Sequence, residues 1–156
     1  MKTVCALFAV LLAFSIAAAV DLTGRVVGVS DGDTITILVG KQTTKVRLYG
    51  IDCPEKSQDF GSRAKEFTSL EAFGKPVTVE VKDTDRYGRQ VGIVTLPDGR
   101  NLNYELVRTG MAWWYRHYSD DDSLRILEQA ARDAKLGLWS MENPTPPWEF
   151  RKQRRR

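Results

Sequence analysis

The spacing of apolar residues along this chain changes from a period of two to about 3.6 and back, and this order restricts its fold more than any other feature. Three β-branched runs separated by turn residues such as Asp31-Gly32 come first, at residues 22–30, 34–39 and 43–49. From Ser57 to Phe73 the apolar residues recur at helical spacing: Phe60, Ala64, Phe67, Leu70 and Phe73. Two more strands and two more helices are predicted, at residues 77–81, 89–96, 101–109 and 119–136.

The resulting order, β-β-β-α-β-β-α-α, predicts an α+β fold that is mainly β. Five short antiparallel strands with a helix between the third and fourth suit a five-stranded OB-fold barrel with three helices. Residues 20–142 are enough for one domain with its own core and too few for two. After Trp139 the run ENPTPPW interrupts regular structure, so residues 143–156 are expected to form a Pro-rich and then basic tail that is disordered.

Residues 1–19 have the pattern of a secretory signal peptide. Lys2 precedes an apolar run, and Ala17-Ala18-Ala19 supplies small residues at the position of a cleavage site. The run from Val4 to Val20 is close to the shortest length that spans a bilayer, so an uncleaved anchor is the alternative. Cleavage predicts an exported protein, periplasmic or secreted, without stable membrane association.

The composition excludes several kinds of chemistry. Without residues 1–19 the chain has one cysteine, Cys53, and one histidine, His117. These exclude a disulfide framework, a tetrahedral zinc site and a mechanism with two histidines. Chemistry must therefore depend mainly on carboxylates, arginines and a metal with oxygen ligands.

Positive charge is concentrated at the C-terminus. The last six residues are RKQRRR, whereas residues 20–150 have a formal charge of −3. The body of the protein is therefore not a generally basic nucleic-acid binder. The basic tail either contacts the phosphates of a polyanion or only aids solubility.

Three carboxylates lie next to strand ends. Asp33 begins one predicted strand, and Asp52 and Glu55 follow another. If residues 34–39 pair with 43–49, Asp33 and Asp52 meet at one rim. Two carboxylates with backbone carbonyls and water make a site for a hard cation, Ca²⁺ or the more demanding Mg²⁺. Alternatively, these aspartates only stabilise turns.

Arginine and aromatic side chains could complete such a site. Arg47 and Arg89 carry guanidinium groups that suit a phosphodiester, although each alone could be an ordinary surface ion-pair partner. The aromatic run from Trp113 to Tyr118 could stack on bases or pack in the core.

Together these residues resemble the staphylococcal nuclease (thermonuclease) family. Three blocks carry the resemblance, and Gly137-Leu138-Trp139-Ser140 is a weaker fourth. The three are Asp31-Gly32-Asp33-Thr34, Arg47-Leu48-Tyr49-Gly50-Ile51-Asp52-Cys53-Pro54-Glu55 and Asp85-Arg86-Tyr87-Gly88-Arg89. Their order and spacing extend the resemblance over residues 22–140.

The resemblance implies a Ca²⁺-dependent phosphodiesterase that hydrolyses DNA and RNA with little sequence preference and leaves 3′-phosphates. A monomer is the default expectation for a domain this small with no obvious spare apolar face. It implies metal binding by Asp33, Asp52 and the backbone carbonyl of Cys53, a position where the family commonly has threonine. It implies three catalytic residues, Arg47, Glu55 and Arg89. It also implies contacts with the nucleotide from Tyr87 and from Tyr115 or Tyr118.

Two other functions fit the same residues. A non-catalytic OB-fold nucleic-acid-binding module would bind intact nucleic acid without releasing Ca²⁺-dependent fragments. An extracytoplasmic Ca²⁺-binding structural protein would be stabilised by Ca²⁺ and would leave the two arginines unexplained.

Overall fold

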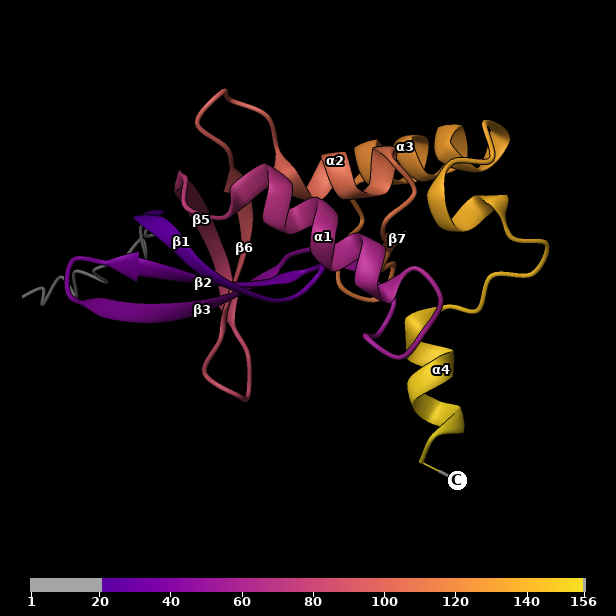
Figure 1. Ribbon diagram of the computed structural model, residues 1–156, viewed down its shortest axis with the longest axis horizontal. Helices are drawn as coiled ribbons and strands as arrows, with labels where there is room; N and C mark the ends of the chain where they lie inside the picture. The colour runs from indigo at the N-terminus through magenta and orange to yellow at the C-terminus, as the bar shows by residue number, and fades with distance from the viewer. Residues whose placement is uncertain (1–20, 156) are drawn as a thin grey trace, which may run out of the picture.

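Five strands close into a barrel in the computed structural model, which describes residues 21–155 (Figure 1). The strands are β1 (Asp21–Asp31), β2 (Thr34–Val39), β3 (Gln42–Leu48), β5 (Pro76–Thr84) and β6 (Gln90–Thr95). They pair in the order β1-β2-β3-β6-β5, and β5 pairs with β1 to complete the circle. The predicted five-stranded OB-fold barrel of a mainly β, α+β protein is confirmed.

One strand pairing differs from the expected antiparallel arrangement. β3 and β6 run parallel, with Val46, Arg47 and Leu48 opposite Gln90, Val91 and Gly92. The helix and strand between them return the chain to the same end of the barrel, which a parallel pair requires. The barrel is therefore mixed.

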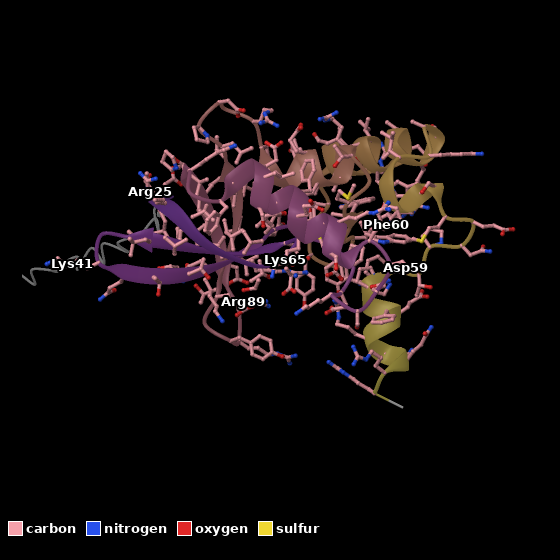
Figure 2. The ribbon with its side chains drawn as sticks, in the orientation of Figure 1. Arg25, Lys41, Asp59, Phe60, Lys65 and Arg89 are labelled. Carbon is pink, nitrogen blue, oxygen red and sulfur yellow. The ribbon has the colours of Figure 1, made fainter. Side chains whose placement is uncertain are left out.

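The barrel interior is filled by β-branched and leucine side chains. Ile35 and Ile37 of β2 alternate with more exposed neighbours, as expected for a strand with one face in the core. They pack with residues from the other four strands: Val26, Val46, Leu48, Val79 and Val94. Lys41, at the β2–β3 turn, lies at the far end of the barrel from Asp59 and Phe60, which lead into the first helix (Figure 2).

Four α-helices and a short 3₁₀-helix accompany the barrel on one side and beyond one end, where three helices were expected (Figure 1). They are α1 (Gly61–Ala72), α2 (Leu102–Arg108), α3 (Asp122–Asp133), the 3₁₀-helix η1 (Gly137–Ser140) and α4 (Pro147–Gln153). α1 lies across the barrel, α2 and α3 pack side by side, and α4 lies near the segment that precedes α1 (Figure 1).

The buried face of α1 differs from the expected face. Leu70 and Phe73 are exposed, whereas Ala64, Thr68 and Ala72 are fully buried. The Thr68 hydroxyl donates a hydrogen bond to the backbone oxygen of Gly32, so a polar residue lies on the core-facing side. Small residues let the helix approach the barrel closely, so Leu70 and Phe73 remain outside while Phe67 packs partly against the core.

The structure also differs from the expected disordered tail over residues 143–156. α4 occupies its centre, with Pro147 at the first helical position, where the missing N–H of proline costs nothing. The predicted signal peptide, residues 1–19, lies outside the described residues. Within residues 21–155, every helix is too short or too polar to cross a membrane.

Two very short strands connect the helical region to the barrel. β4 (Ile51–Asp52) pairs with β7 (Trp113–Trp114), so Asp52 lies opposite Trp113. The turn before β4 uses Gly50 at a φ of 75°, which glycine adopts at little cost. This pairing fixes the chain immediately after β3 and thereby positions Asp52.

Candidate active site

Asp33, Arg47 and Asp52 meet at one rim of the barrel, as the predicted strand pairing requires. Asp33 directly precedes β2, and its backbone oxygen accepts a hydrogen bond from Leu48 N at 2.9 Å. Thr34 lies opposite Arg47 in the β2–β3 register. Asp52 reaches the same rim because only two residues separate the end of β3 from the start of β4.

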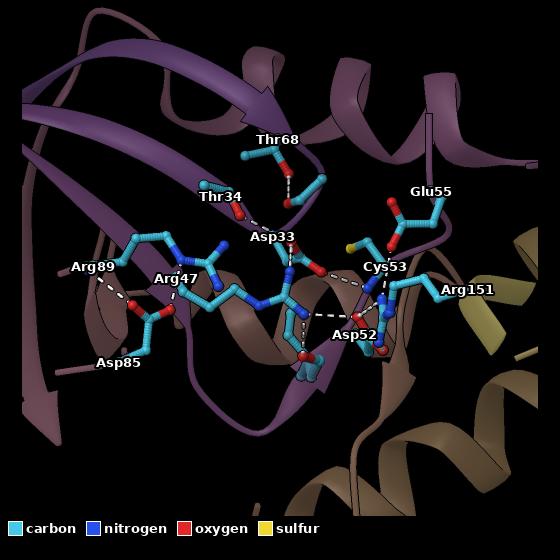
Figure 3. A network of polar contacts seen from close by, with 12 residues as sticks. Asp33, Thr34, Arg47, Asp52, Cys53, Glu55, Thr68, Asp85, Arg89 and Arg151 are labelled. Carbon is cyan, nitrogen blue, oxygen red and sulfur yellow. Dashed lines mark hydrogen bonds and ion pairs between the residues drawn. The ribbon is translucent and has the colours of Figure 1, made fainter. Parts of the chain in front are cut away.

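Arg47 connects the two aspartates through its guanidinium group (Figure 3). Its Nη1 pairs with Asp33 Oδ1, and its Nη2 lies 2.7 Å from Asp52 Oδ1. The second oxygen of Asp33 accepts a hydrogen bond from Cys53 N at 2.6 Å. Two carboxylates from different parts of the chain therefore share one cation.

Because the two carboxylates of this cluster are buried, their negative charges are costly unless a positive charge pairs with them. Asp33 and Asp52 are 1% and 0% exposed. Burial raises the pKa of Asp33 above its ordinary value, because Arg47 offsets only part of the desolvation. Burial acts to lower the pKa of Arg47, but the charges of Asp33 and Asp52 outweigh it and raise that pKa. The two aspartates thus lie where a positive charge is strongly favoured.

Cys53 contributes its backbone to this cluster, while its thiol packs in the core. The side chain is buried among the core residues, and its sulfur lies close to Gly32 and Ala64. Burial raises the pKa of the Cys53 thiol well above its usual range, so the thiol stays protonated at neutral pH. A side chain at Gly32 would come within 2.8 Å of this sulfur, which explains why glycine suits that turn.

Glu55 lies on the loop between β4 and α1. Its backbone N–H donates to Gln58 Oε1 at 3.1 Å, and its backbone oxygen accepts from Gln58 N at 2.8 Å. A Cβ at Gly61 would lie 1.9 Å from that same oxygen, so only glycine lets the start of α1 pack so closely against Glu55. Gln58 and Gly61 therefore fix the position of the Glu55 loop.

Arg151 of α4 also reaches this cluster, and sequence reasoning missed it. Its Nη2 lies 2.7 Å from Asp52 Oδ2, and its Nη1 lies 2.7 Å from Glu55 Oε1. Burial acts to lower the pKa of Arg151, but the hydrogen bonds that it donates to the Asp52 and Glu55 carboxylates raise it overall. The one sequence signal for it is the Pro146-Pro147 pair, which can begin a helix.

Arg89 and Tyr87 form a separate group beside the cluster. Arg89 Nε pairs with Asp85 Oδ2 at 2.7 Å, on the far side of Arg47 from Arg151 (Figure 3). Partial burial acts to raise the pKa of Asp85, but hydrogen bonds donated by Arg89 and Tyr87 lower it overall. Tyr87 is 69% exposed, and the guanidinium carbons of Arg86 and Arg89 lie 4.9 and 5.6 Å from the centroid of its ring. An exposed aromatic face with two cations is suited to contact a nucleotide.

The other two predicted contact residues, Tyr115 and Tyr118, lie together. Their ring centroids are 5.1 Å apart, and Tyr118 is 68% exposed. Tyr115 is half-buried because Trp148 of α4 stacks on it at 5.3 Å with an angle of 24° between the ring planes. Of the pair, Tyr118 therefore has the more accessible ring.

Comparison with known proteins connects this arrangement to a family. The family model described as "Staphylococcal nuclease homologue" matches residues 45–141, which include Arg47, Asp52, Glu55 and Arg89. The chain belongs to the staphylococcal nuclease family. This confirms the resemblance found in the sequence.

Several family relatives match most of the chain. A protein named "Uncharacterized endonuclease" from Escherichia coli O157:H7 is 46% identical over 131 residues, which cover 84% of this chain and 86% of that protein. A "Micrococcal nuclease" from Shigella flexneri is 44% identical and covers 92% of this chain and 88% of its own length. Membership of this family supports a hydrolytic nuclease with nucleic acid as its substrate.

Proposed function

We propose that this staphylococcal nuclease family member hydrolyses phosphodiester bonds of DNA and RNA in a Ca²⁺-dependent reaction, with little sequence preference, and leaves 3′-phosphates. The single observation that carries this proposal is the cluster in which Arg47 joins Asp33 and Asp52. Glu55 adjoins the same cluster through Arg151. One rim thus combines acidic oxygens with a phosphate-binding guanidinium group.

The residues at this rim fit a hard cation. Asp33 and Asp52 offer carboxylate oxygens, and the Cys53 thiol faces the core, which leaves its backbone carbonyl as the donor suited to calcium. Within residues 21–155 no group of three or more His, Cys, Asp or Glu side chains is arranged to hold a metal, so water would complete the ligand set. When bound, Ca²⁺ would offset the negative charge of the scissile phosphate.

Glu55 is proposed to act on the attacking water. Its side chain is 36% exposed and is fixed by a backbone that Gln58 and Gly61 hold in place. A carboxylate in this position can orient the water and accept its proton as the oxygen–phosphorus bond forms. The bond from phosphorus to the 5′-oxygen then breaks, and the phosphate stays attached to the 3′-oxygen of the other fragment.

The two arginines are proposed to contact the phosphate. Arg47 is held at the rim by β3, and its forked guanidinium group can bind two phosphate oxygens. Arg89 starts from its ion pair with Asp85 and can help the departing 5′-oxygen. Tyr87, Tyr115 and Tyr118 are proposed to contact the nucleotide, and export is proposed from the N-terminal sequence.

Replacing Glu55 with glutamine tests this mechanism. Glu55→Gln keeps the size of the side chain but removes the base, so kcat for fragment release from single-stranded DNA in Ca²⁺ is expected to fall about 10²–10⁴-fold. Glu66→Gln is the matched control, because Glu66 is an exposed residue on α1, and it should retain kcat within about twofold. A wild-type kcat in Glu55→Gln would remove Glu55 from the mechanism.

The alternative is a non-catalytic nucleic-acid-binding module. It predicts a salt-sensitive complex with intact DNA or RNA and no fragments, whatever the Ca²⁺ concentration. The wild-type protein in the same assay distinguishes the two functions.

A further inference from the structure

The helix α4 contacts the proposed active site through the side chain of Arg151. Arg151 binds Asp52 Oδ2 at 2.7 Å and Glu55 Oε1 at 2.7 Å, and its Nη1 also lies 3.2 Å from Asp52 Oδ1 (Figure 3). The same helix thus contacts a proposed metal ligand and the proposed general base. Arg151 comes from 99 positions further along the chain than Asp52.

Contacts away from Arg151 also hold α4 in this position. Gln58 Nε2 donates to the backbone oxygen of Thr145 at 2.5 Å, and Arg154 Nη1 donates to Ser57 Oγ at 2.9 Å. Trp148 packs against both Trp113 and Tyr115, with ring centroids 5.6 and 5.3 Å apart. The helix is therefore docked at both of its ends and along one face.

The two oxygens of Asp52 are shared between two guanidinium groups. Oδ1 accepts from Arg47 at 2.7 Å, and Oδ2 accepts from Arg151 at 2.7 Å. A divalent cation on either oxygen would lie within a few ångströms of the Arg151 charge, where repulsion in a buried site is strong. Arg47 belongs to a strand of the closed barrel, whereas Arg151 belongs to a two-turn helix that is not part of the barrel. Arg151 is therefore the cation that can leave.

We propose that Arg151 competes with the divalent cation for Asp52, so that α4 is an autoinhibitory segment released when the metal binds. The same movement separates Trp148 from Tyr115 and exposes a ring proposed to contact the nucleotide. It also frees Glu55 from its ion pair. One helix thereby controls the metal ligand, the base and part of the substrate surface. This inference rests on the proposed Ca²⁺ site.

Calcium affinity tests the competition directly. Isothermal titration calorimetry of Arg151→Gln is expected to show at least fivefold tighter Ca²⁺ binding than the wild type, because the competing charge is gone. Trp148→Ala weakens docking without touching a carboxylate, and it should also tighten Ca²⁺ binding. Lys152→Gln removes the same charge from an exposed position of the same helix, and its affinity should stay within twofold of wild type.

Amide hydrogen exchange provides a second readout. In α4, Phe150 N and Arg154 N donate hydrogen bonds to the backbone oxygens of Pro146 and Phe150. Adding Ca²⁺ to the wild type should accelerate amide exchange in α4 severalfold and leave the exchange rates of α2 unchanged. Equal Ca²⁺ affinity in wild type, Arg151→Gln and Trp148→Ala, with no change in α4 exchange, would overturn the competition and leave the Ca²⁺ site standing. Absence of Ca²⁺ binding in all variants would overturn the site itself and the competition with it.

Discussion

Arg47 determines the electrostatics of the rim, because two almost fully buried carboxylates depend on it. Asp33 has no other ion pair among the described residues, whereas Asp52 also has Arg151. The meeting of Asp33 and Asp52 could be predicted from sequence, because the Asp-Gly turn and the two flanking strands leave few possible registers. The sharing of one guanidinium group could not, since it depends on side-chain directions at the rim.

Removing Arg47 should therefore destabilise the protein. Arg47→Met leaves a buried carboxylate without its charge partner, and we expect the free energy of unfolding to fall by about 2–4 kcal/mol. Urea denaturation at pH 7 in EDTA measures this change. Lys45→Met on the same strand is the control, because Lys45 is exposed, and it should change stability by less than about 0.5 kcal/mol. Equal stability of Arg47→Met and wild type would contradict this account of the cluster.

Arg151 could not be assigned to the site from sequence. It stands in a basic run that resembles a solvated tail, and it reaches Asp52 through tertiary packing of Trp148 rather than through a local pattern. Cys53 illustrates the opposite case. Its position among the motif residues suggested a carbonyl ligand, and the burial of its thiol is compatible with that role.

Among the secondary-structure elements, α3 begins at a well-defined N-cap. Asp121 accepts hydrogen bonds from Ser123 N at 2.9 Å and from Tyr104 Oη at 2.7 Å. Desolvation acts to raise its pKa, but the bonds from Tyr104 and Ser123 lower the pKa of Asp121 below its ordinary value. The aspartates before this helix made its start predictable within a few residues.

Asp121→Ala should cost about 1–2 kcal/mol of stability at pH 7. Because the folded-state pKa is lowered, this contribution is complete above the unfolded pKa of about 3.9 and is lost as pH falls through the folded value. The stability difference between wild type and Asp121→Ala, measured by urea denaturation, should therefore stay constant above about pH 5 and narrow as the pH falls below about 4. Asp121→Asn retains an accepting oxygen and should lose less stability than Asp121→Ala. A difference that stays constant down to pH 3 would argue against the charged cap.

The helix α1 shows where element-level patterns fail. Its apolar residues occur at helical spacing, yet Leu70 and Phe73 are exposed, and Thr68 is buried through its bond to Gly32 O. Helical spacing predicts that a helix exists, but the buried face depends on how closely the barrel approaches. Here the close approach selects small residues.

For the molecule as a whole, the closed five-stranded barrel could be predicted from sequence, but two strand pairings could not. The strand order follows from alternating apolar residues and turn signals. The parallel pairing of β3 with β6 and the short β4–β7 ladder join residues far apart in the chain. Neither pairing leaves a local pattern in the sequence. Together the two pairings position Asp52 and Arg89 around the rim.

Ca²⁺-dependent cleavage is tested by fragment release from single-stranded DNA by the purified chain lacking residues 1–19, with Ca²⁺ and with EDTA. We expect fragments in Ca²⁺, none in EDTA, and renewed cutting when excess Ca²⁺ is restored. Equal fragment release in EDTA would contradict a Ca²⁺-dependent mechanism at Asp33 and Asp52. Tight DNA binding without fragments in either condition would instead indicate a binding module.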